Sequence, residues 1–256
     1  MQKNEGRMKI NILCENHIGH HLPKSCTAEW GLSLLIQHNG LNILFDTGHT
    51  GAFVHNAQAM NLDIESLDYI VISHYHWDHL NGLFKHPFKS KIKLIIHPDI
   101  LTNISEQEVL YLQNHFEIIL SDSPYQISKE IIFLGEIPRL THFEKGVYKD
   151  NPMKDDTALA IKTEKGLVVI SGCSHSGICN ICEYAHSLTS LPLYAVIGGF
   201  HLSEYDTQAL EGTILYFKEK KPHLLYPMHC VDFYTLVRFY NEFQINKPGT
   251  GDYIEI

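Results

Sequence analysis

The chain has 256 residues, of which 44% are hydrophobic and 19% are charged, so it can bury a large core in one domain. Its formal net charge of −9 argues against binding to duplex nucleic acid, which needs a basic face. No apolar run reaches the about 18 residues that would span a membrane, and residues 1–9 lack the apolar stretch of a signal peptide. We therefore expect one domain over residues 1–256, in the cytoplasm, that acts on a small molecule.

The chain contains six cysteines, and an even number can indicate disulfides. A chain of this length can be stabilised by its core alone, so reduced thiols and a cytoplasmic location are favoured. Cys179 and Cys182 have CxxC spacing, which suits a redox pair or half of a zinc site. No second CxxC completes a four-cysteine site. We interpret the pair as small apolar side chains on one face of a helix.

In the first half of the chain, apolar runs and helical spacing alternate. Asn39-Gly40 between two apolar runs predicts a hairpin turn, and Ser105 with Glu108 predicts a capped helix start. The segment 98–128 is an insertion that could form a lid or the wall of a substrate pocket. The predicted strands are 9–14, 30–38, 41–45, 69–72 and 91–97, and the predicted helices are 49–62, 80–84 and 106–115.

The second half repeats this alternation, as two similar sheets would. The residues 167–170 are all apolar and predict a strand that is buried on both faces. The other predicted strands are 130–138, 158–162, 193–197 and 223–230, and the predicted helices are 178–188, 207–220 and 233–243.

The buried strand 69–72 is followed by a cluster of metal-ligand side chains, His74, His76, Asp78 and His79. Imidazole and carboxylate bind zinc, iron and manganese. Residues two apart in an extended segment point the same way, so His74 and His76 can bind one metal. Asp78 and His79 point elsewhere and can bind a second metal, as in hydrolytic sites with two metals about 3.5–4 Å apart. A His-rich surface turn is disfavoured, because active sites lie at such strand ends.

The segment 73–79 resembles the HxHxDH signature of the metallo-β-lactamase superfamily, although Asn81-Gly82 stands where Gly-Gly is usual. The resemblance implies an α/β fold, the four-layer αββα sandwich, with two mixed sheets face to face and helices outside. It also implies that Asp46, which ends the strand 41–45, orients the ligand loop by hydrogen bonds and does not bind a metal. The alternative is an ordinary Asp in a turn.

A second set of polar residues follows the buried strand 167–170. His175 lies there in a turn bounded by Gly172 and Gly177, and we predict that it is the third His on the first metal. His142, in the polar loop 141–155, is the alternative. Many superfamily members carry a metal-bridging Asp where this chain has Cys173, which speaks against β-lactam hydrolysis and leaves a bridging thiolate possible.

Two further His residues follow predicted strands. His201 comes after Gly198-Gly199 and could bind a metal, hold a substrate phosphate, act as acid or base, or be structural. His229 ends the last strand, and the resemblance implies that it completes the second metal site.

A closer resemblance rests on five segments. Together they are similar to the subfamily of 7,8-dihydropterin-6-methyl-4-(β-D-ribofuranosyl)-aminobenzene-5′-phosphate synthase-like proteins. The segments are 31–33, 45–48, 172–177, 198–202 and 228–230.

These features predict a metal-dependent hydrolase or phosphate-ester-type transferase with two divalent metals, zinc first and iron or manganese as alternatives. A metal-bound hydroxide, from water whose pKa falls from 15.7 to about 7, would attack the substrate. Asp78, His201 and Asp46 would serve the chemistry on an anionic small molecule, with a pterin-type phosphate as one candidate. The alternative is a di-iron redox protein or a small-ligand sensor without hydrolysis.

Overall fold

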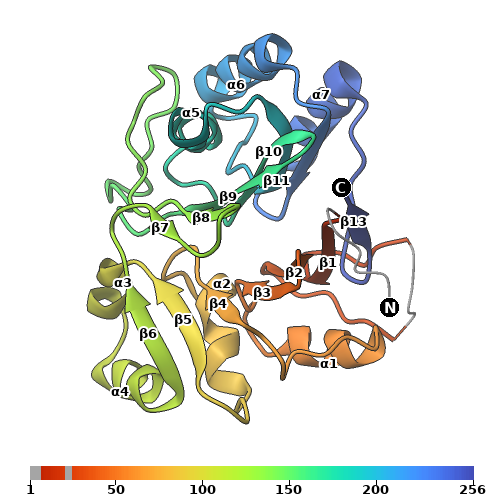
Figure 1. Cartoon of the computed structure of the whole chain (residues 1–256). Helices are drawn as coiled ribbons and strands as arrows, with labels where there is room; N and C mark the ends of the chain where they lie inside the picture. Colours follow the sequence, from red (N-terminus) through yellow and green to blue (C-terminus); the bar gives the residue numbers. More distant parts are fainter. Residues whose placement is uncertain (1–6, 21–24) are drawn as a thin grey trace. The chain divides into compact units, whose positions relative to one another are not determined.

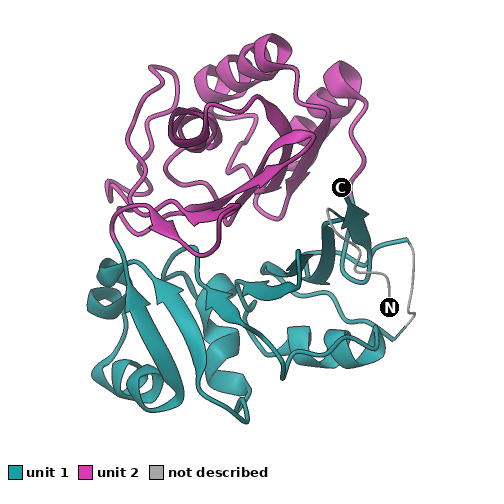
Figure 2. Ribbon diagram, viewed as in Figure 1, with its two compact units in different colours: residues 1–121, 248–256 teal, residues 122–247 magenta. Residues whose placement is uncertain are grey.

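The computed structural model describes residues 7–20 and 25–256, so the start of the N-terminal segment considered above lies outside the described residues. The chain divides into two compact units (Figure 2). Unit 1 comprises residues 1–121 and 248–256, and unit 2 comprises residues 122–247. That these two units form the single domain predicted for residues 1–256 stays a prediction.

Unit 1 contains a seven-stranded mixed sheet (Figure 1), in the order β13-β1-β2-β3-β4-β5-β6. Antiparallel pairing joins β13, β1, β2 and β3, and parallel pairing joins β3, β4, β5 and β6. Asn39 and Gly40 both have positive φ, 47° and 82°, which is the conformation of a tight hairpin turn. The strands are β1 (Lys9–Cys14), β2 (Ser33–His38), β3 (Leu41–Phe45), β4 (Tyr69–Val71), β5 (Ile92–Ile96), β6 (Phe116–Leu120) and β13 (Tyr253–Glu255).

The helices of unit 1 connect the parallel strands. They are α1 (Ala52–Ala59), α2 (Trp77–Leu80), the 3₁₀ helix η1 (Asn81–Lys85), α3 (Pro98–Asn103) and α4 (Glu106–His115). The predicted capping box is present at α4, where Ser105 accepts from the Glu108 N–H and the Glu108 side chain accepts from Ser105. The predicted end of the strand at His97 is instead the N-cap of α3, because its side chain accepts from the Asp99 N–H at 3.1 Å.

Unit 2 contains a six-stranded sheet in the order β12-β11-β10-β9-β8-β7. The strands β10, β11 and β12 are parallel, and β9, β8 and β7 continue the sheet with antiparallel pairing. The strands are β7 (Tyr125–Gln126), β8 (Ile131–Phe133), β9 (Ala158–Thr163), β10 (Gly166–Ser171), β11 (Leu193–Gly199) and β12 (Leu224–Met228), and the helices are α5 (Ile178–Thr189), α6 (Thr207–Lys220) and α7 (Phe233–Phe243).

Most predicted elements are present, and the differences have local causes. The predicted strand 130–138 ends at Phe133, and Gly135 adopts a left-handed φ of 71° two residues later, which an extended strand does not accommodate. The strands β6, β7 and β13 were not predicted. Within the described parts of the chain, no helix has both the length and the apolar character needed to cross a membrane.

Parallel pairing places the polar strand ends at one edge of each sheet. In unit 1, Phe45 pairs with Val71, so Asp46 lies beside the segment that leads to His74. In unit 2, Ser171 pairs with Gly198 and Gly199 pairs with Met228. The residues after β10, β11 and β12 therefore come together, as expected for the carboxyl ends of neighbouring parallel strands.

The CxxC cysteines lie on α5 inside the core of unit 2. Cys179 and Cys182 are 0% exposed and belong to its apolar cluster. The Cys179 thiol donates to the Thr213 hydroxyl at 3.6 Å. Burial raises the pKa of both thiols well above the ordinary value, so both stay protonated and unreactive.

Replacing both cysteines with Ala should leave the metal content unchanged. The lost core contacts should lower the free energy of unfolding by roughly 1–3 kcal/mol. Denaturant unfolding and metal analysis of the Cys179→Ala/Cys182→Ala protein measure the two effects. Loss of metal from a variant with a native circular dichroism spectrum would show that the thiols are ligands.

Candidate metal centre

The predicted ligands of unit 1 lie on one short segment after β4. His74 and His76 are in the extended part, and Asp78 and His79 are in the first turn of α2, which begins at Trp77. The His74 ring centroid is 4.6 Å from that of His76 and 4.2 Å from that of His79. His79 Nε2 is 3.9 Å from Asp78 Oδ2. The structure thus brings these four side chains together within unit 1.

A buried carboxylate holds this segment in place. Asp46 is 0% exposed and accepts from the Ser73 N–H and the Ser73 hydroxyl, both at 2.7 Å. Its Oδ2 also lies 2.6 Å from His79 Nδ1. Because Nδ1–H of His79 donates to Asp46, this ring would coordinate a metal through Nε2. These are the hydrogen bonds expected of Asp46.

The hydroxyl of Ser73 extends this arrangement to His74. Ser73 Oγ lies 2.9 Å from His74 Nδ1. Since the hydroxyl proton is donated to Asp46, the oxygen accepts from Nδ1–H of His74. His74 would therefore also coordinate a metal through Nε2. One carboxylate thus sets the tautomer of two imidazoles.

The start of α2 is tied to the loop after β3 by Thr47. Its hydroxyl donates to the carbonyl oxygens of His79 and Leu80, at 2.9 and 3.2 Å. Its N–H donates to the same His79 carbonyl oxygen at 2.8 Å. A Cβ at position 82 would lie 2.0 Å from the Thr47 carbonyl oxygen. Only glycine fits at position 82, which explains why the signature keeps Gly82.

In unit 2, donor side chains follow the three parallel strands. Cys173 and His175 come after β10, His201 after β11, and His229 and Cys230 after β12. The rings of His175 and His201 have centroids 4.3 Å apart. One donor atom each from Cys173, His229 and Cys230 lies within 4.8 Å of the others. Of the cysteine donors, Cys173 was considered above only as a possible bridging thiolate, and Cys230 was not considered as a ligand.

The loop that carries His175 is held by Asp156, which the sequence analysis did not assign to the site. Asp156 is 0% exposed, and it accepts from the His175 N–H at 3.1 Å, the Ser176 N–H at 3.0 Å and the Ser176 hydroxyl at 2.5 Å. Burial raises the pKa of its carboxyl, and the Ser176 hydrogen bonds oppose the shift. The repeated pair Asp-Thr, at 46–47 and 156–157, is the signal that could have found it.

The polar loop 141–155 lies against the same loop of unit 2. Tyr148 has its ring centroid 4.9 Å from that of His175 and 5.6 Å from that of His201. Arg139 donates to the Gly146 carbonyl oxygen through Nε and Nη2, at 3.1 and 2.7 Å, which fixes the loop next to Tyr148. Sequence reasoning missed Tyr148, because nothing in a polar loop marks one aromatic residue.

His142, the alternative to His175, lies elsewhere on this loop. Its side chain is exposed, and its ring contacts Phe143 at 5.4 Å between centroids. In the part of the chain that the structure describes, His142 belongs to no cluster of donor atoms. His175 is only 6% exposed and its backbone is held by Asp156. The geometry of unit 2 favours His175 as the ligand.

The thiol of Cys230 has an unusual acidity. Burial alone would raise its pKa, but its interaction with Cys173 and the positive charges that His229 and His201 can carry lower the pKa to about 6. A thiol with this pKa is largely thiolate at neutral pH, and thiolate is the form that binds metals.

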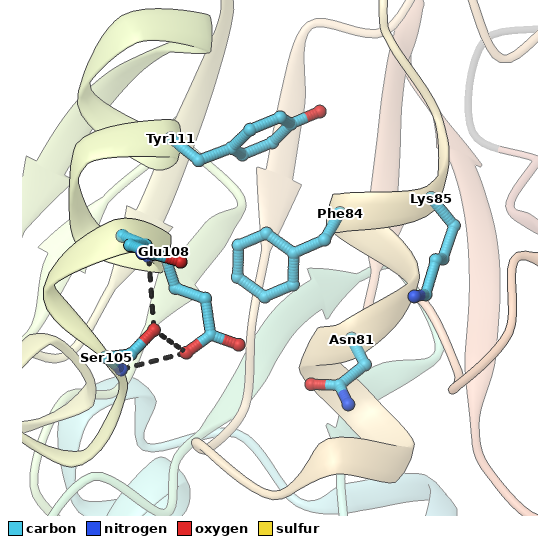
Figure 3. A pocket seen from close by; sticks show the side chains of 7 residues that line it. Asn81, Phe84, Lys85, Ser105, Glu108 and Tyr111 are labelled. Atoms are coloured by element: carbon cyan, nitrogen blue, oxygen red, sulfur yellow. Dashed lines mark hydrogen bonds between the residues drawn. The ribbon is translucent and has the colours of Figure 1, made fainter.

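A pocket of about 340 Å³ lies next to η1 in unit 1 (Figure 3). The rings of Phe84 and Tyr111 pack edge to face, with centroids 5.5 Å apart, and Glu108 is held by its bonds to Ser105. Part of the insertion thus lines a pocket, and its role toward a substrate stays a prediction. The lining residues are Asn81, Phe84, Lys85, Ser105, Gln107, Glu108 and Tyr111.

The donor chemistry of both units fits divalent metals. Unit 1 supplies three imidazoles and a carboxylate, two of the imidazoles with Nδ1 already engaged. Unit 2 supplies imidazoles and thiols. This is the nitrogen, oxygen and sulfur set that zinc accepts, and the fixed Nδ1–H groups are the usual support for a His ligand.

Comparison with known proteins identifies the family. The sequence matches the model of the metallo-beta-lactamase superfamily over residues 30–185. A 7,8-dihydropterin-6-methyl-4-(beta-D-ribofuranosyl)-aminobenzene-5'-phosphate synthase of Methanocaldococcus jannaschii is 32% identical to this chain, over 93% of the chain and 92% of the relative. An uncharacterized protein of the same organism is 33% identical, over 84% of the chain and 89% of that protein.

A solved structure extends the likeness to the fold. The crystal structure of a metal-dependent hydrolase of the beta-lactamase superfamily superposes with a TM-score of 0.82 at 26% identity, covering 97% of this chain and 99% of that one. The chain therefore belongs to the metallo-beta-lactamase superfamily. Within it, the chain is a member of the dihydropterin-ribofuranosyl-aminobenzene phosphate synthase-like subfamily. The predicted family and the α/β fold of the metallo-β-lactamase type are both confirmed.

Replacing Asp46 with Ala should lower the affinity for divalent metal by about 10- to 100-fold, because His79 and Ser73 lose their hydrogen-bond acceptor. Titration of the metal-free protein with zinc measures this change. Asp68→Asn is a matched control. Asp68 is an exposed carboxylate just before β4, and it accepts a hydrogen bond from the Asn42 N–H of β3. Equal affinities in the two variants would contradict a supporting role for Asp46.

His175→Ala should weaken metal binding far more than His142→Ala. His175 is buried and held through its backbone, whereas the His142 side chain is exposed, and a ligand must be held to within a few tenths of an Å. Metal titrations of the two folded variants give the order directly. The reverse order would exclude the 172–177 turn as a ligand loop.

Proposed function

We propose that this protein is a metal-dependent hydrolase with two divalent metals bound by His74, His76, Asp78, His79, His175 and His229. The observation that carries the proposal is the buried cluster of unit 1, in which Asp46 presets His79 and, through Ser73, His74 for coordination by Nε2. Such preset ligands are costly to maintain for fold stability alone and are typical of metal sites. The similar hydrolase structure supports this reaction type.

When bound, the metals would act as Lewis acids and lower the pKa of a coordinated water toward about 7. Asp78 would bind the second metal together with His79 and His229. His201, an exposed side chain beside His175, would donate a proton or a hydrogen bond to the substrate oxygen on which charge develops. Asp46 would keep the ligand loop in place. Zinc is the first candidate metal, and iron or manganese are alternatives.

We infer that the substrate is a small anionic molecule that carries a phosphate ester. The similar synthase of Methanocaldococcus jannaschii is named for a product with a pterin, an aminobenzene ring and a ribofuranosyl 5'-phosphate, which supports a sugar phosphate that also carries aromatic rings. The pocket of unit 1 offers two aromatic rings and the ammonium group of Lys85, a combination that suits such a ligand.

The same relative favours a second candidate reaction. A synthase joins two molecules, so transfer of a phosphate-ester-bearing group to an acceptor other than water is the alternative to hydrolysis. Incubating the protein with an aryl phosphodiester, with and without a dihydropterin acceptor, separates the two. Release of a phenol or alcohol and a phosphate monoester without the acceptor supports hydrolysis, and product formation only with the acceptor supports transfer.

Replacing His76 or Asp78 with Ala should remove at least one metal per chain and lower kcat by at least about 100-fold, since a two-metal reaction needs both ions. Metal analysis and turnover of the best substrate measure both effects. His223→Ala is a matched control, because His223 is exposed, stacks on Tyr194 and belongs neither to the proposed ligands nor to the pocket lining. Full activity and two metals per chain in either test variant would refute the proposal.

A coloured, iron-loaded protein without hydrolysis would favour redox chemistry.

A further inference from the structure

Two thiols at the carboxyl edge of the unit 2 sheet have no place in the ligand set proposed above. Cys173 follows β10 and Cys230 follows β12, and β11 lies between these strands in the sheet. The Cys230 thiol nevertheless reaches the Cys173 carbonyl oxygen at 3.4 Å. The two Sγ atoms and a ring nitrogen of His229 lie within 4.8 Å of one another. Three soft or borderline donors therefore converge from two loops.

Gly199 at the end of β11 makes this convergence possible. Its N–H donates to the Gly172 carbonyl oxygen at 2.8 Å, so its backbone runs directly past the loop of Cys173. A Cβ at position 199 would lie 2.7 Å from Cys230 Sγ and 3.1 Å from Cys173 Cα. The absence of a side chain at position 199 lets the Cys230 thiol lie against the backbone of β11. Any larger residue would push the two thiols apart.

The chemistry of the three donors selects a class of metal. Zinc binds thiolate sulfur at about 2.3 Å and imidazole nitrogen at about 2.0–2.1 Å, so ligand atoms around one ion are about 3.3–3.8 Å apart. Donors within 4.8 Å of one another need only small side-chain rotations to reach that spacing. Thiolate ligands favour zinc and iron(II) and disfavour magnesium and manganese.

We propose that Cys173 and Cys230 are thiolate ligands that, together with His229, bind one of the two divalent metals and make that site selective for zinc or iron(II). The proposal rests on the proposed two-metal function and names further ligands of the same centre. Binding breaks the S–H bond of each thiol, forms two metal–sulfur bonds and releases the protons to solvent. The donors of this site lie largely inside the protein, since Cys173 is 4% and His229 3% exposed and Cys230 is half-buried.

The test uses cobalt(II), which replaces zinc and reports sulfur ligands by charge-transfer absorption in the near ultraviolet. The full-length protein is stripped of metal under reducing conditions and titrated with cobalt(II). The wild-type protein should develop these bands. Cys173→Ser and Cys230→Ser should each lose about half of the intensity, and the double variant nearly all, because intensity follows the number of metal–sulfur bonds. The Cys179→Ala/Cys182→Ala protein is the control and should keep full intensity.

Selectivity gives a second readout that does not depend on turnover. The ratio of zinc to manganese affinity should fall by at least about 10-fold in the Cys173→Ser/Cys230→Ser protein relative to wild type, because the remaining nitrogen and oxygen donors discriminate less. A competition titration measures this ratio. An unchanged ratio would overturn the proposal.

A measurement on the wild-type protein avoids dependence on variants that fail to fold. Alkylation of the native protein followed by peptide mass analysis should modify Cys230 in the metal-free form, and saturating zinc should slow that reaction by at least about 10-fold. Equal rates with and without zinc would overturn the proposal. So would a Cys173–Cys230 disulfide in protein isolated with reductant.

The outcomes separate this inference from the proposed function. Wild-type protein that binds two cobalt ions without sulfur charge-transfer bands would overturn the thiolate ligands and leave the two-metal hydrolase standing. Wild-type protein that binds no cobalt at all would overturn both.

Discussion

The His-rich loop after β4 in unit 1 depends on one group, the buried carboxylate of Asp46. Removing a charged carboxylate from water costs several kcal/mol unless hydrogen bonds replace its hydration. Asp46 receives these bonds from Ser73 and His79, and each bond to a charged group contributes about 1.5–3 kcal/mol. The cost of burial is thus offset only when the loop adopts the conformation that presents its imidazoles.

Unit 2 also holds its loop with a buried Asp, but this Asp comes before a strand and not after one. Asp156 precedes β9, whereas Asp46 follows β3, yet both carboxylates accept the N–H and the hydroxyl of a serine in a ligand loop. Ser73 comes directly before His74, and Ser176 directly after His175. Each unit therefore holds its loop of donor side chains around one buried Asp and one Ser, and these hydrogen bonds keep the loop in one conformation.

Several site residues also carry backbone strain. Asp46, Ser174, His201 and His229 have φ values of 57°, 62°, 47° and 50°, a left-handed conformation that non-glycine residues adopt at a cost of order 1–3 kcal/mol. All four directly follow a strand or lie in the turn after one. The left-handed conformation ends the extended path of the chain at the sheet edge, which is where the donor side chains lie.

The sequence by itself determined the elements and the ligand types. Alternating apolar runs, the Asn39-Gly40 turn and the capping box at Ser105 act through nearby residues, and the strands and helices they predict are present. The HxHxDH segment identified four donor side chains that lie together in unit 1, because their spacing is local. Asp46 was assigned through the family resemblance, and its hydrogen bonds are present.

Only the tertiary structure decided the contacts between segments far apart in the chain. Three kinds of observation depend on which strands are neighbours. They are the contacts of Asp156 and Tyr148 with His175, the exposure of His142, and the approach of Cys230 to Cys173 beside Gly199. Strand order follows from long-range packing, and no local pattern of residues specifies it. The short strand β13 could not be predicted for the same reason, since it is a strand through its pairing with β1, which is far away in the sequence.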